Sequence, residues 1–421
     1  MDKFVINGGK VLTGEVSVSG AKNSVLALMP AVLLNNGKNV ISNVPEVNDI
    51  FTMMKLLSQL GVKASFENHV MELDSTNITS QTAPYEHVKK MRASVYVLGP
   101  LLAKYGYSKV SMPGGCAWGP RPIDLHLEAM KKLGAEIELE KGYIIAKTKR
   151  LHGARINFDI SSVGATGNAL MAAVLAKGST QISNAAVEPE ITQLVEYLIS
   201  MGAKIEGAGT SVLEIEGVDE LNSAKTENIP DRIEAGTLLI AAAITKGKIT
   251  LKNAFPNHLS AVLQKLEDSN VKVNINNKLI EVDSSNINIK NTDVTTAIYP
   301  GFPTDMQAQW TAFMALADGT STITDTIYLD RFKHVPELRR LGADIEILNN
   351  SAVVKGVKKL TGAKVMSTDL RASASLVLAG LAAEGSTEVL RIYHLDRGYQ
   401  RIEEKLQSLG ADIRRVKTEE Y

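Results

Sequence analysis

One loop of the sequence holds residues that could transfer a proton to an anionic substrate. It runs from Ser111 to Pro122 and contains the only cysteine of the chain, Cys116, with Arg121 five positions later. Its three glycines and three prolines exclude a regular helix or strand, because glycine loosens the backbone and proline removes donors. A thiol with a pKa near about 8.5 is mostly protonated at neutral pH and can donate a proton. A lone cysteine is more often a small buried hydrophobic residue, but the polar loop around Cys116 disfavours that interpretation.

Further charged and polar residues precede six alanine-rich stretches of the chain. Helix N-termini carry free N–H groups and a partial positive charge, so a position at the start of a helix suits an anionic ligand. If the stretches are helices that point the same way within a domain, these residues converge on one face of it. The residues at or just before the starts are Lys22, Asn23, Arg92, Ser162, Val163, Gly164, Arg232, Asp305, Asp369 and Arg371.

Each of these residues has a plainer explanation when it is taken alone. Lys22 and Arg92 could be solvated surface charges, and Asp305 could be a first-turn acid that favours the helix dipole. Asp369 could be an N-cap, and residues 162–164 could be only a turn. Their recurrence at one position of a repeated unit favours a binding site. No His or Glu grouping has the spacing of a zinc motif, so we expect no metal and no other cofactor.

A short pattern recurs about every 70 residues and divides the chain into six units. It consists of Leu or Met, then Gly-Ala or Gly-Val, and then a charged residue. The fourth copy along the chain has Asn in place of Gly, and both residues tolerate the left-handed end of a helix. The copies are Leu60-Gly61-Val62-Lys63, Leu133-Gly134-Ala135-Glu136, Met201-Gly202-Ala203-Lys204, Ser269-Asn270-Val271-Lys272, Leu341-Gly342-Ala343-Asp344 and Leu409-Gly410-Ala411-Asp412.

Each unit also holds an alanine-rich stretch that ends at a glycine. Small or apolar residues surround these stretches on nearly all sides, which predicts buried helices. They span residues 21–37, 92–106, 164–178, 234–247, 304–319 and 370–385. A short strand such as 40–43, an amphipathic helix such as 49–60 and a hairpin such as 136–146 complete the unit. The sequence therefore predicts a mixed α/β fold in which sheets and outer helices enclose buried central helices.

The 421 residues exceed what one hydrophobic core usually supports, and three units plus three units predict two similar domains. We expect each to enclose three buried helices, with the strands of residues 1–20 joining the second half. The expected domains are residues 22–229, which carry the Cys116 loop, and residues 1–21 with 230–421. In the sixth repeat, residues 394–397 take the position of the Cys116 loop. We therefore expect a site in a cleft between the domains.

The composition excludes several classes of protein. Basic and acidic residues are equal in number, 46 of each, which argues against binding nucleic acid or anionic membranes by bulk charge. A single cysteine excludes internal disulfides and fits a reducing cytosol. Residues 1–5 show no signal-peptide pattern, and no apolar run reaches the roughly 20 residues of a membrane span. We expect a soluble, cytoplasmic protein with small-molecule partners.

Four motifs resemble those of the enolpyruvyl transferase family, in particular its members that act on UDP-N-acetylglucosamine at the start of peptidoglycan precursor synthesis. The motifs are Lys22-Asn23, Pro113-Gly114-Gly115-Cys116-Ala117 with Arg121-Pro122 and Asp124-Leu125-His126 behind it, Gly301-Phe302-Pro303-Thr304-Asp305, and His394-Leu395-Asp396-Arg397-Gly398-Tyr399. The resemblance covers essentially the whole chain. It implies two α/β domains, each an inside-out α/β barrel built from three repeats. It also implies transfer of the enolpyruvyl group of phosphoenolpyruvate to the sugar 3′-hydroxyl, with release of phosphate.

The resemblance assigns catalytic roles to individual residues. Cys116 would be the general acid that protonates C3 of phosphoenolpyruvate, and Asp305 would accept the proton of the sugar hydroxyl. The carboxylate and phosphate of phosphoenolpyruvate would bind Lys22, Arg121 and Arg397, because an arginine fork holds two oxygens at once. Asn23 would hold the tetrahedral intermediate by hydrogen bonds.

The resemblance also implies contacts to the nucleotide sugar. They are Arg92, Arg121, Pro122, Ile123, Asp124, Leu125, Ser162, Val163, Gly164, Asp305 and Ile327, while Asp369, Leu370 and Arg371 would support closure and adduct breakdown. The chain departs from the family at Ile160, where relatives often carry a basic residue, and this puts one diphosphate contact in question. Gly114 and Gly115 give the Cys116 loop hinge freedom, so we expect it to act as a lid that the nucleotide sugar orders.

Three other functions remain open on the sequence. The sister enzyme that acts on shikimate 3-phosphate shares the repeats and phosphoenolpyruvate, but it needs neither a cysteine lid nor uracil recognition. A ring-shaped DNA clamp is also built from α/β repeats, but it would carry Lys and Arg on repeat-equivalent helices, where this chain has alanine. A catalytically inactive paralogue would lack the reactive residues, whereas Lys22, Cys116, Asp305 and Arg397 are all present.

Overall fold

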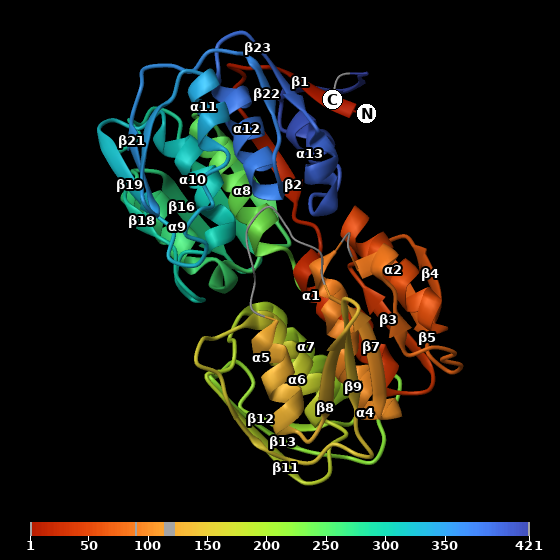
Figure 1. Ribbon diagram of the computed structural model, residues 1–421. Coiled ribbons are helices and arrows are strands. Elements are labelled where there is room, and N and C mark those ends of the chain that lie inside the picture. The colour runs from red at the N-terminus through yellow and green to blue at the C-terminus, as the bar shows by residue number, and fades with distance from the viewer. Residues whose placement is uncertain (1, 89–90, 113–122, 420–421) are drawn as a thin grey trace. The chain divides into compact units, whose positions relative to one another are not determined.

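The computed structural model describes residues 2–88, 91–112 and 123–419, and for residues 87, 88 and 92 it describes the backbone alone. The chain divides into a continuous unit, Gly20–Ile229, and a discontinuous unit, Met1–Ser19 with Pro230–Tyr421 (Figure 1). The chain passes between the units at Ser19-Gly20 and at Ile229-Pro230. The boundaries expected from the sequence, at 21/22 and 229/230, stay a prediction for independently folding domains.

The described part of the continuous unit contains three four-stranded sheets, and all three have the same topology. In each sheet the first two strands are parallel, and the remaining neighbours are antiparallel. The strand orders are β14 (Lys225–Glu227), β3 (Lys38–Ser42), β5 (Val70–Asp74), β4 (Lys63–Glu67); β6 (Thr82–Ala83), β7 (Tyr107–Ser111), β9 (Tyr143–Lys147), β8 (Glu136–Glu140); and β10 (Arg155–Asn157), β11 (Ser179–Ser183), β13 (Val212–Glu216), β12 (Lys204–Glu206).

The discontinuous unit repeats this topology in three further sheets of its described residues. Their strand orders are β2 (Thr13–Ser17), β15 (Lys248–Lys252), β17 (Leu279–Asp283), β16 (Lys272–Asn276); β18 (Val294–Thr295), β19 (Thr320–Thr324), β21 (Ser351–Lys355), β20 (Asp344–Leu348); and β22 (Lys364–Met366), β23 (Ser386–Leu390), β1 (Asp2–Asn7), β24 (Asp412–Lys417). The N-terminal strands β1 and β2, red in Figure 1, lie among the green and blue elements of this unit. In the sixth repeat β24 is therefore not followed by a hairpin partner, and β1 takes that place.

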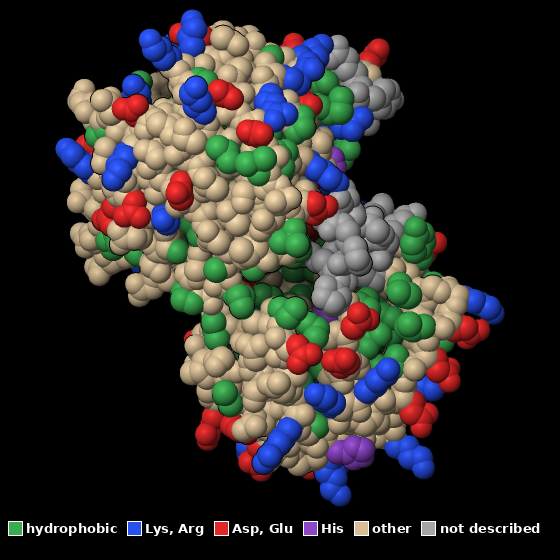
Figure 2. All heavy atoms as spheres, turned by 60° about the vertical axis from the view of Figure 1, so that its left-hand side comes forward, with side chains coloured by type: hydrophobic (Ala, Val, Ile, Leu, Met, Phe, Trp, Pro, Cys, Tyr) green, Lys and Arg blue, Asp and Glu red, His purple; other side chains and the backbone are tan. Residues whose placement is uncertain are grey.

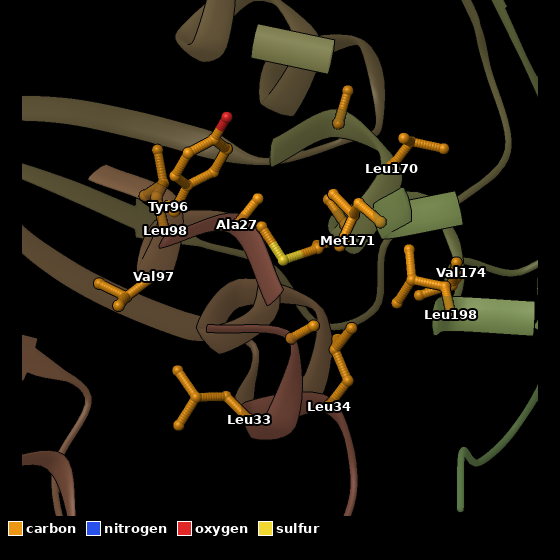
Figure 3. Packing of buried hydrophobic residues seen from close by; sticks show 14 of the residues in the cluster. Ala27, Leu33, Leu34, Tyr96, Val97, Leu98, Leu170, Met171, Val174 and Leu198 are labelled. Carbon is orange, nitrogen blue, oxygen red and sulfur yellow. The ribbon is translucent and has the colours of Figure 1, made fainter. Parts of the chain in front are cut away.

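A central helix packs inside each repeat, and most of its residues are buried, as the sequence predicts. The helices are α1 (Lys22–Ala31), α4 (Leu98–Tyr105), α6 (Val163–Ala173), α8 (Arg232–Ile244), α10 (Gln307–Met314) and α12 (Leu370–Ala382), with 3₁₀ turns η1 (Val32–Leu34), η2 (Arg92–Val97) and η4 (Thr304–Met306) beside α1, α4 and α10. Small side chains let these helices approach one another closely. Figure 3 shows part of the core of the continuous unit, where Ala27 of α1, Leu98 of α4 and Met171 of α6 lie in one hydrophobic cluster.

Amphipathic outer helices cover the repeats. They are α2 (Asn48–Leu60), α5 (Asp124–Lys132), α7 (Pro189–Ser200), α9 (Ser260–Asp268), α11 (Val335–Arg340) and α13 (Ile402–Ser408), with the short α3 (Tyr85–Val88), η3 (Pro256–His258) and η5 (Ile392–Arg397) in connections. The predicted left-handed residues after these helices are confirmed, with φ of 109° at Gly61 and 71° at Asn270. Only glycine and a few polar residues adopt such angles at little cost. The repeat pattern therefore marks the helix ends.

The surface carries no single-sign field on the face that Figure 2 shows. Lysine and arginine side chains lie interspersed with aspartate and glutamate over both units (Figure 2). Because the charges are mixed, an anion would be bound by individual cationic side chains and not by a uniformly positive surface. Within the described residues, every helix is too short or too polar to span a bilayer.

Candidate functional site

The carboxylate of Asp305 lies in η4, just before α10 in the discontinuous unit, between two guanidinium groups. Arg331 Nη1 donates to Oδ1 at 2.8 Å, and Arg371 Nη2 donates to Oδ2 at 3.0 Å. Burial alone would raise the pKa of Asp305, but the two guanidiniums outweigh it and hold the pKa well below its ordinary value. The Asp305 side chain keeps 27% of its surface exposed, while those of Arg331 and Arg371 keep 9% and 6%. One side of the ionised Asp305 carboxylate is therefore open to solvent, while its other side contacts two buried guanidinium groups.

The hydroxyl of Tyr399 joins the N-terminal halves of the three central helices in this unit. It lies 2.8 Å from Thr237 Oγ1 of α8, and it accepts from Gln309 of α10 at 3.3 Å and from Arg371 of α12 at 3.2 Å. Because the Thr237 hydroxyl donates to the Ile233 carbonyl, the Tyr399 hydroxyl donates to Thr237. This network fixes Arg371, and through it Asp305. The predicted convergence of helix starts is thus present within this unit.

The start of α12 carries Asp369, Leu370 and Arg371. Asp369 is the N-cap of α12, since its Oδ1 accepts from the amides of Arg371 at 2.9 Å and Ala372 at 3.1 Å. This agrees with the plainer reading of Asp369 from the sequence. Its charge also lies near His394, where it opposes the lowering of that pKa by burial.

The turn η5 brings Arg397 beside the start of α12. A Cβ at Gly398 would come within 2.8 Å of Leu370 Cδ2, so the turn packs closely against the start of α12. Arg397 itself is half-buried. The discontinuous unit therefore gathers Asp305, Asp369, Arg371 and Arg397, four residues predicted from the sequence, around adjoining helix starts.

Ile327 belongs to the same neighbourhood. Its amide donates to Asp325 Oδ1 at 2.9 Å, and Asp325 Oδ2 accepts from Thr304 Oγ1 at 2.7 Å, next to Asp305. The Ile327 side chain is 38% exposed. The buried Asp325 thus ties the Ile327 segment to the turn that carries Asp305, and leaves an apolar side chain at the surface beside it.

In the continuous unit, Lys22 begins α1 and forms an ion pair with Asp49 of α2, with Nζ 3.1 Å from Oδ2. Both side chains are nearly buried, at 10% and 6% exposure. A buried ammonium needs such a carboxylate to stay charged. Asn23, the next residue along α1, is exposed. The plainer explanation of Lys22, a solvated surface charge, does not fit this burial.

Ser162, Val163 and Gly164 form the start of α6, where the Ser162 hydroxyl accepts from the Ala165 amide at 3.3 Å. The predicted segment Ile123, Asp124 and Leu125 lies at the start of α5. His126 joins the two segments, because a Cβ on Gly164 would lie 3.0 Å from its ring. Ile160 is 66% exposed, so the surface before the turn carries an apolar side chain.

His126 is buried against Asn168, with Nδ1 3.0 Å from the Asn168 amide nitrogen. Burial lowers the pKa of His126 to about 4, so the ring is neutral at pH 7. Since the amide nitrogen is a donor, Nδ1 accepts and Nε2 carries the ring proton. Asn168 in turn accepts from the Gly99 amide at 2.7 Å. The start of α6 is thereby held rigidly beside a neutral N–H donor.

Some predicted residues lie outside the described part of the chain. They are Cys116, Arg121 and Pro122, together with the side chain of Arg92. The residues flanking this loop end β7 and begin α5, just as η5 lies between β23 and α13 in the sixth repeat. Three polar residues contact these helix starts and were not identified as partners from the sequence: Arg331, Tyr399 and Asp49. Their contacts are long-range, so no local spacing could identify them.

Three comparisons relate the chain to known proteins. A family model described as EPSP synthase (3-phosphoshikimate 1-carboxyvinyltransferase) matches residues 6–406. The UDP-N-acetylglucosamine 1-carboxyvinyltransferase of Chloroherpeton thalassium is 60% identical, covering 100% of this chain and 99% of the relative, and the protein of the same name from Chlorobium luteolum is 56% identical with full coverage of both.

Two solved structures share the architecture. The enolpyruvyl transferase NikO of Streptomyces tendae superposes with a TM-score of 0.89 at 25% identity, covering 99% of each chain. EPSP synthase of Acinetobacter baumannii gives a TM-score of 0.78 at 18% identity, covering 99% of this chain and 100% of that one, which bears on the fold alone. The predicted fold class of repeated mixed α/β units is confirmed by these similarities.

Proposed function

The chain belongs to the EPSP synthase family of carboxyvinyltransferases, and we propose that it transfers the enolpyruvyl group of phosphoenolpyruvate to the 3′-hydroxyl of UDP-N-acetylglucosamine. The observation that carries this choice of acceptor is the 56–60% identity, over the full length, with relatives named for this reaction. The products are UDP-N-acetylglucosamine enolpyruvate and phosphate. In this proposal the enolpyruvyl product is a precursor of peptidoglycan.

A few placed cations bind phosphoenolpyruvate in this proposal. Lys22 at the start of α1 and Arg397 beside the start of α12 are half-buried or buried, so their charges are weakly screened by water. Each lies where a helix N-terminus adds positive potential. Arg121, outside the described residues, is the third proposed cation, and Asn23 hydrogen-bonds the adduct.

The reaction proceeds by addition and elimination. The 3′-oxygen bonds to C2 of phosphoenolpyruvate while its proton passes to a carboxylate, and C3 accepts a proton from the Cys116 thiol. Loss of phosphate from C2 and of one proton from C3 then restores the double bond, and the C3 proton returns to the thiolate. Proton transfers by positioned groups of this kind contribute about 10²–10⁴ in rate.

Asp305 is the proposed acceptor of the hydroxyl proton, and its geometry sets a condition on that role. A carboxylate whose pKa is held far below its ordinary value is a weak base. An anionic substrate group that draws Arg331 or Arg371 toward itself would remove one hydrogen bond from Asp305 and raise its pKa. Substrate binding thereby converts Asp305 from a fixed anion into a base.

The nucleotide sugar is bound by residues at the starts of α5 and α6 in this proposal. The free amides at Ser162, Val163 and Gly164 suit a diphosphate, while Ile123, Asp124 and Leu125 approach the same place through His126. A neutral His126 avoids a fixed charge there but can donate from Nε2. Arg92, Arg121 and Pro122 complete the set, with Asp305 and Ile327 at the sugar and Asp369, Leu370 and Arg371 supporting closure and adduct breakdown.

A phosphate-release assay with two acceptors tests the proposal. With phosphoenolpyruvate present, UDP-N-acetylglucosamine should give continuous phosphate release and a product heavier by one enolpyruvyl group. Shikimate 3-phosphate, the acceptor of the sister enzyme, should give none. Release with shikimate 3-phosphate alone, or with neither acceptor, would contradict the proposal.

A further inference from the structure

The residue before Arg397 is held by an arginine on the last strand of the chain. Arg415 of β24 makes a two-pronged contact with Asp396, with Nη1 3.0 Å from Oδ2 and Nη2 2.7 Å from Oδ1. Such a fork fixes both the position and the plane of a carboxylate, which a single point charge does not. Asp396 belongs to η5, the turn that ends at Arg397.

Arg415 is itself held by several groups. Its Nε donates to Glu403 Oε1 at 2.6 Å, Nη1 lies 3.4 Å from Asp2 Oδ2, and its guanidinium carbon lies 5.1 Å from the centre of the Phe4 ring. The hydrogen bonds that Arg415 donates to Asp396, and then those to Glu403, raise the pKa of Arg415 above its ordinary value against the opposing effect of burial. Because Arg415 pairs with Phe4 in the sheet, the anchor belongs to a rigid element. All three nitrogens of the guanidinium are engaged.

The other end of the turn is fixed by packing. Gly398 meets the side chain of Leu370, and Tyr399 is buried with its hydroxyl in the network of Thr237, Gln309 and Arg371. Arg397 thus lies between two anchored neighbours, Asp396 and Gly398. Removing the anchor on Asp396 would leave the backbone of Arg397 fixed from one side only.

We propose that Arg415 is a positioning residue for Arg397 and thereby for phosphoenolpyruvate binding. This inference rests on the proposed function, in which Arg397 binds that substrate. Arg415 acts through Asp396 and touches no substrate. Its loss should therefore weaken phosphoenolpyruvate binding selectively and leave the nucleotide sugar, whose proposed diphosphate contacts lie on α5 and α6, unaffected.

The test uses the full chain with Arg415→Met, Arg415→Lys and Asp396→Asn. Arg414→Met is the matched control, because Arg414 is the preceding residue of the same strand, is 66% exposed and lies 3.9 Å from Asp412. We expect KM for phosphoenolpyruvate to rise about tenfold or more in Arg415→Met and Asp396→Asn, with KM for UDP-N-acetylglucosamine within about twofold of the unaltered chain. Arg415→Lys keeps the charge without the fork and should be intermediate. The double variant Arg415→Met with Asp396→Asn should be no worse than either single one.

Hydrogen exchange supplies a readout that does not depend on turnover. The amides of Gly398 and Tyr399, which donate to the Leu395 carbonyl at 3.1 and 3.0 Å, should exchange faster in Arg415→Met and Asp396→Asn but not in Arg414→Met. Unchanged exchange together with an unchanged KM for phosphoenolpyruvate would overturn the inference. A rise in both KM values together with a fall in kcat would also overturn it, because it would indicate a general structural role. Failure of the unaltered chain to use UDP-N-acetylglucosamine, with exchange still altered in the variants, would instead contradict the proposed function.

Discussion

The two units hold their buried ion pairs at helix starts in different ways. In the discontinuous unit, one carboxylate, Asp305, lies between Arg331 and Arg371 and keeps 27% of its side chain exposed. In the continuous unit, Lys22 meets Asp49, and the exposure of the Asp49 side chain is only 6%. In the first arrangement the carboxylate is partly exposed above two buried arginines. In the second the carboxylate is itself nearly buried beside the lysine.

This difference in exposure fits different roles for the two carboxylates: Asp305 is the proposed proton acceptor, and Asp49 supports Lys22. The Asp49 side chain is nearly buried, and its ion pair holds the Lys22 ammonium in place. Asp305 has an open side and two partners that an anionic substrate can compete for. Two aspartates beside basic residues in one chain are thus expected to have different functions because of their exposure.

The largest effect should follow from Asp305→Asn. The amide cannot accept the hydroxyl proton, so kcat should fall about 10²–10⁴-fold, as the phosphate-release rate would measure. Asp318→Asn, at an exposed position of the same unit, should leave kcat unchanged. A kcat within about threefold of the unaltered chain would contradict the reactive role of Asp305.

Asp49→Asn should act on stability more than on turnover. Without its counter-ion, Lys22 is buried with less compensation, and the free energy of unfolding should fall by about 3 kcal/mol. Urea unfolding measures this loss, and kcat at saturating substrates should change less than in Asp305→Asn. A kcat loss as large as that of Asp305→Asn would break the distinction between the two carboxylates.

His126→Gln should change the pH dependence of stability. His126 has a pKa of about 4 in the fold and about 6.5 when unfolded, so the unfolded chain binds the extra proton between these values and stability falls as pH falls through that window. The loss approaches about 3 kcal/mol near pH 4, and glutamine should abolish it. Urea unfolding at pH 7 and pH 5 measures the slope.

The exposed His152, changed to glutamine, is the matched control and should leave that slope unaltered. His334, also buried with a pKa lowered to about 3, keeps part of the acid sensitivity in every variant. An identical slope in His126→Gln and the unaltered chain would mean that His126 does not titrate in this window.

The smallest effect should come from Tyr399→Phe. The change removes one hydroxyl shared by three helices and leaves the ring in place, so the free energy of unfolding should fall by about 1 kcal/mol. Because Arg371 then loses one contact, kcat should fall a few-fold. Tyr393→Phe, on a ring that is 44% exposed, is the control for thermal unfolding. Equal unfolding temperatures for Tyr399→Phe and Tyr393→Phe would mean that the Tyr399 hydroxyl does not stabilise the helix starts around Asp305.

The repeated elements could be predicted from sequence because their signals are local. A glycine or asparagine at a left-handed helix end, as at Gly61 and Asn270, and an alanine-rich face are visible within one repeat. The same signals place Lys22, Asp305 and Asp369 at helix starts. They do not distinguish an N-cap from a reactive acid, and the structure shows that Asp369 is the former.

Partners across the fold could not be predicted from sequence. Asp305 and Arg371 are 66 residues apart, and Arg331 lies 26 residues from Asp305 with no motif around it. The sequence predicts that the strands of residues 1–20 join the second half, but not that β1 pairs with β24 in the place of a hairpin strand of the sixth repeat. Such pairings depend on how whole repeats close on one another.

The sequence by itself determined the six repeats, the buried central helices and the charged residues at their starts, because backbone preference and hydrophobic period act over a few residues. Tertiary structure alone decided which aspartate is exposed, which arginines hold it, and that Arg415 holds the turn of Arg397. Exposure and ion pairing are sums over neighbours that the chain brings together from distant positions, so they exist only once the repeats have packed.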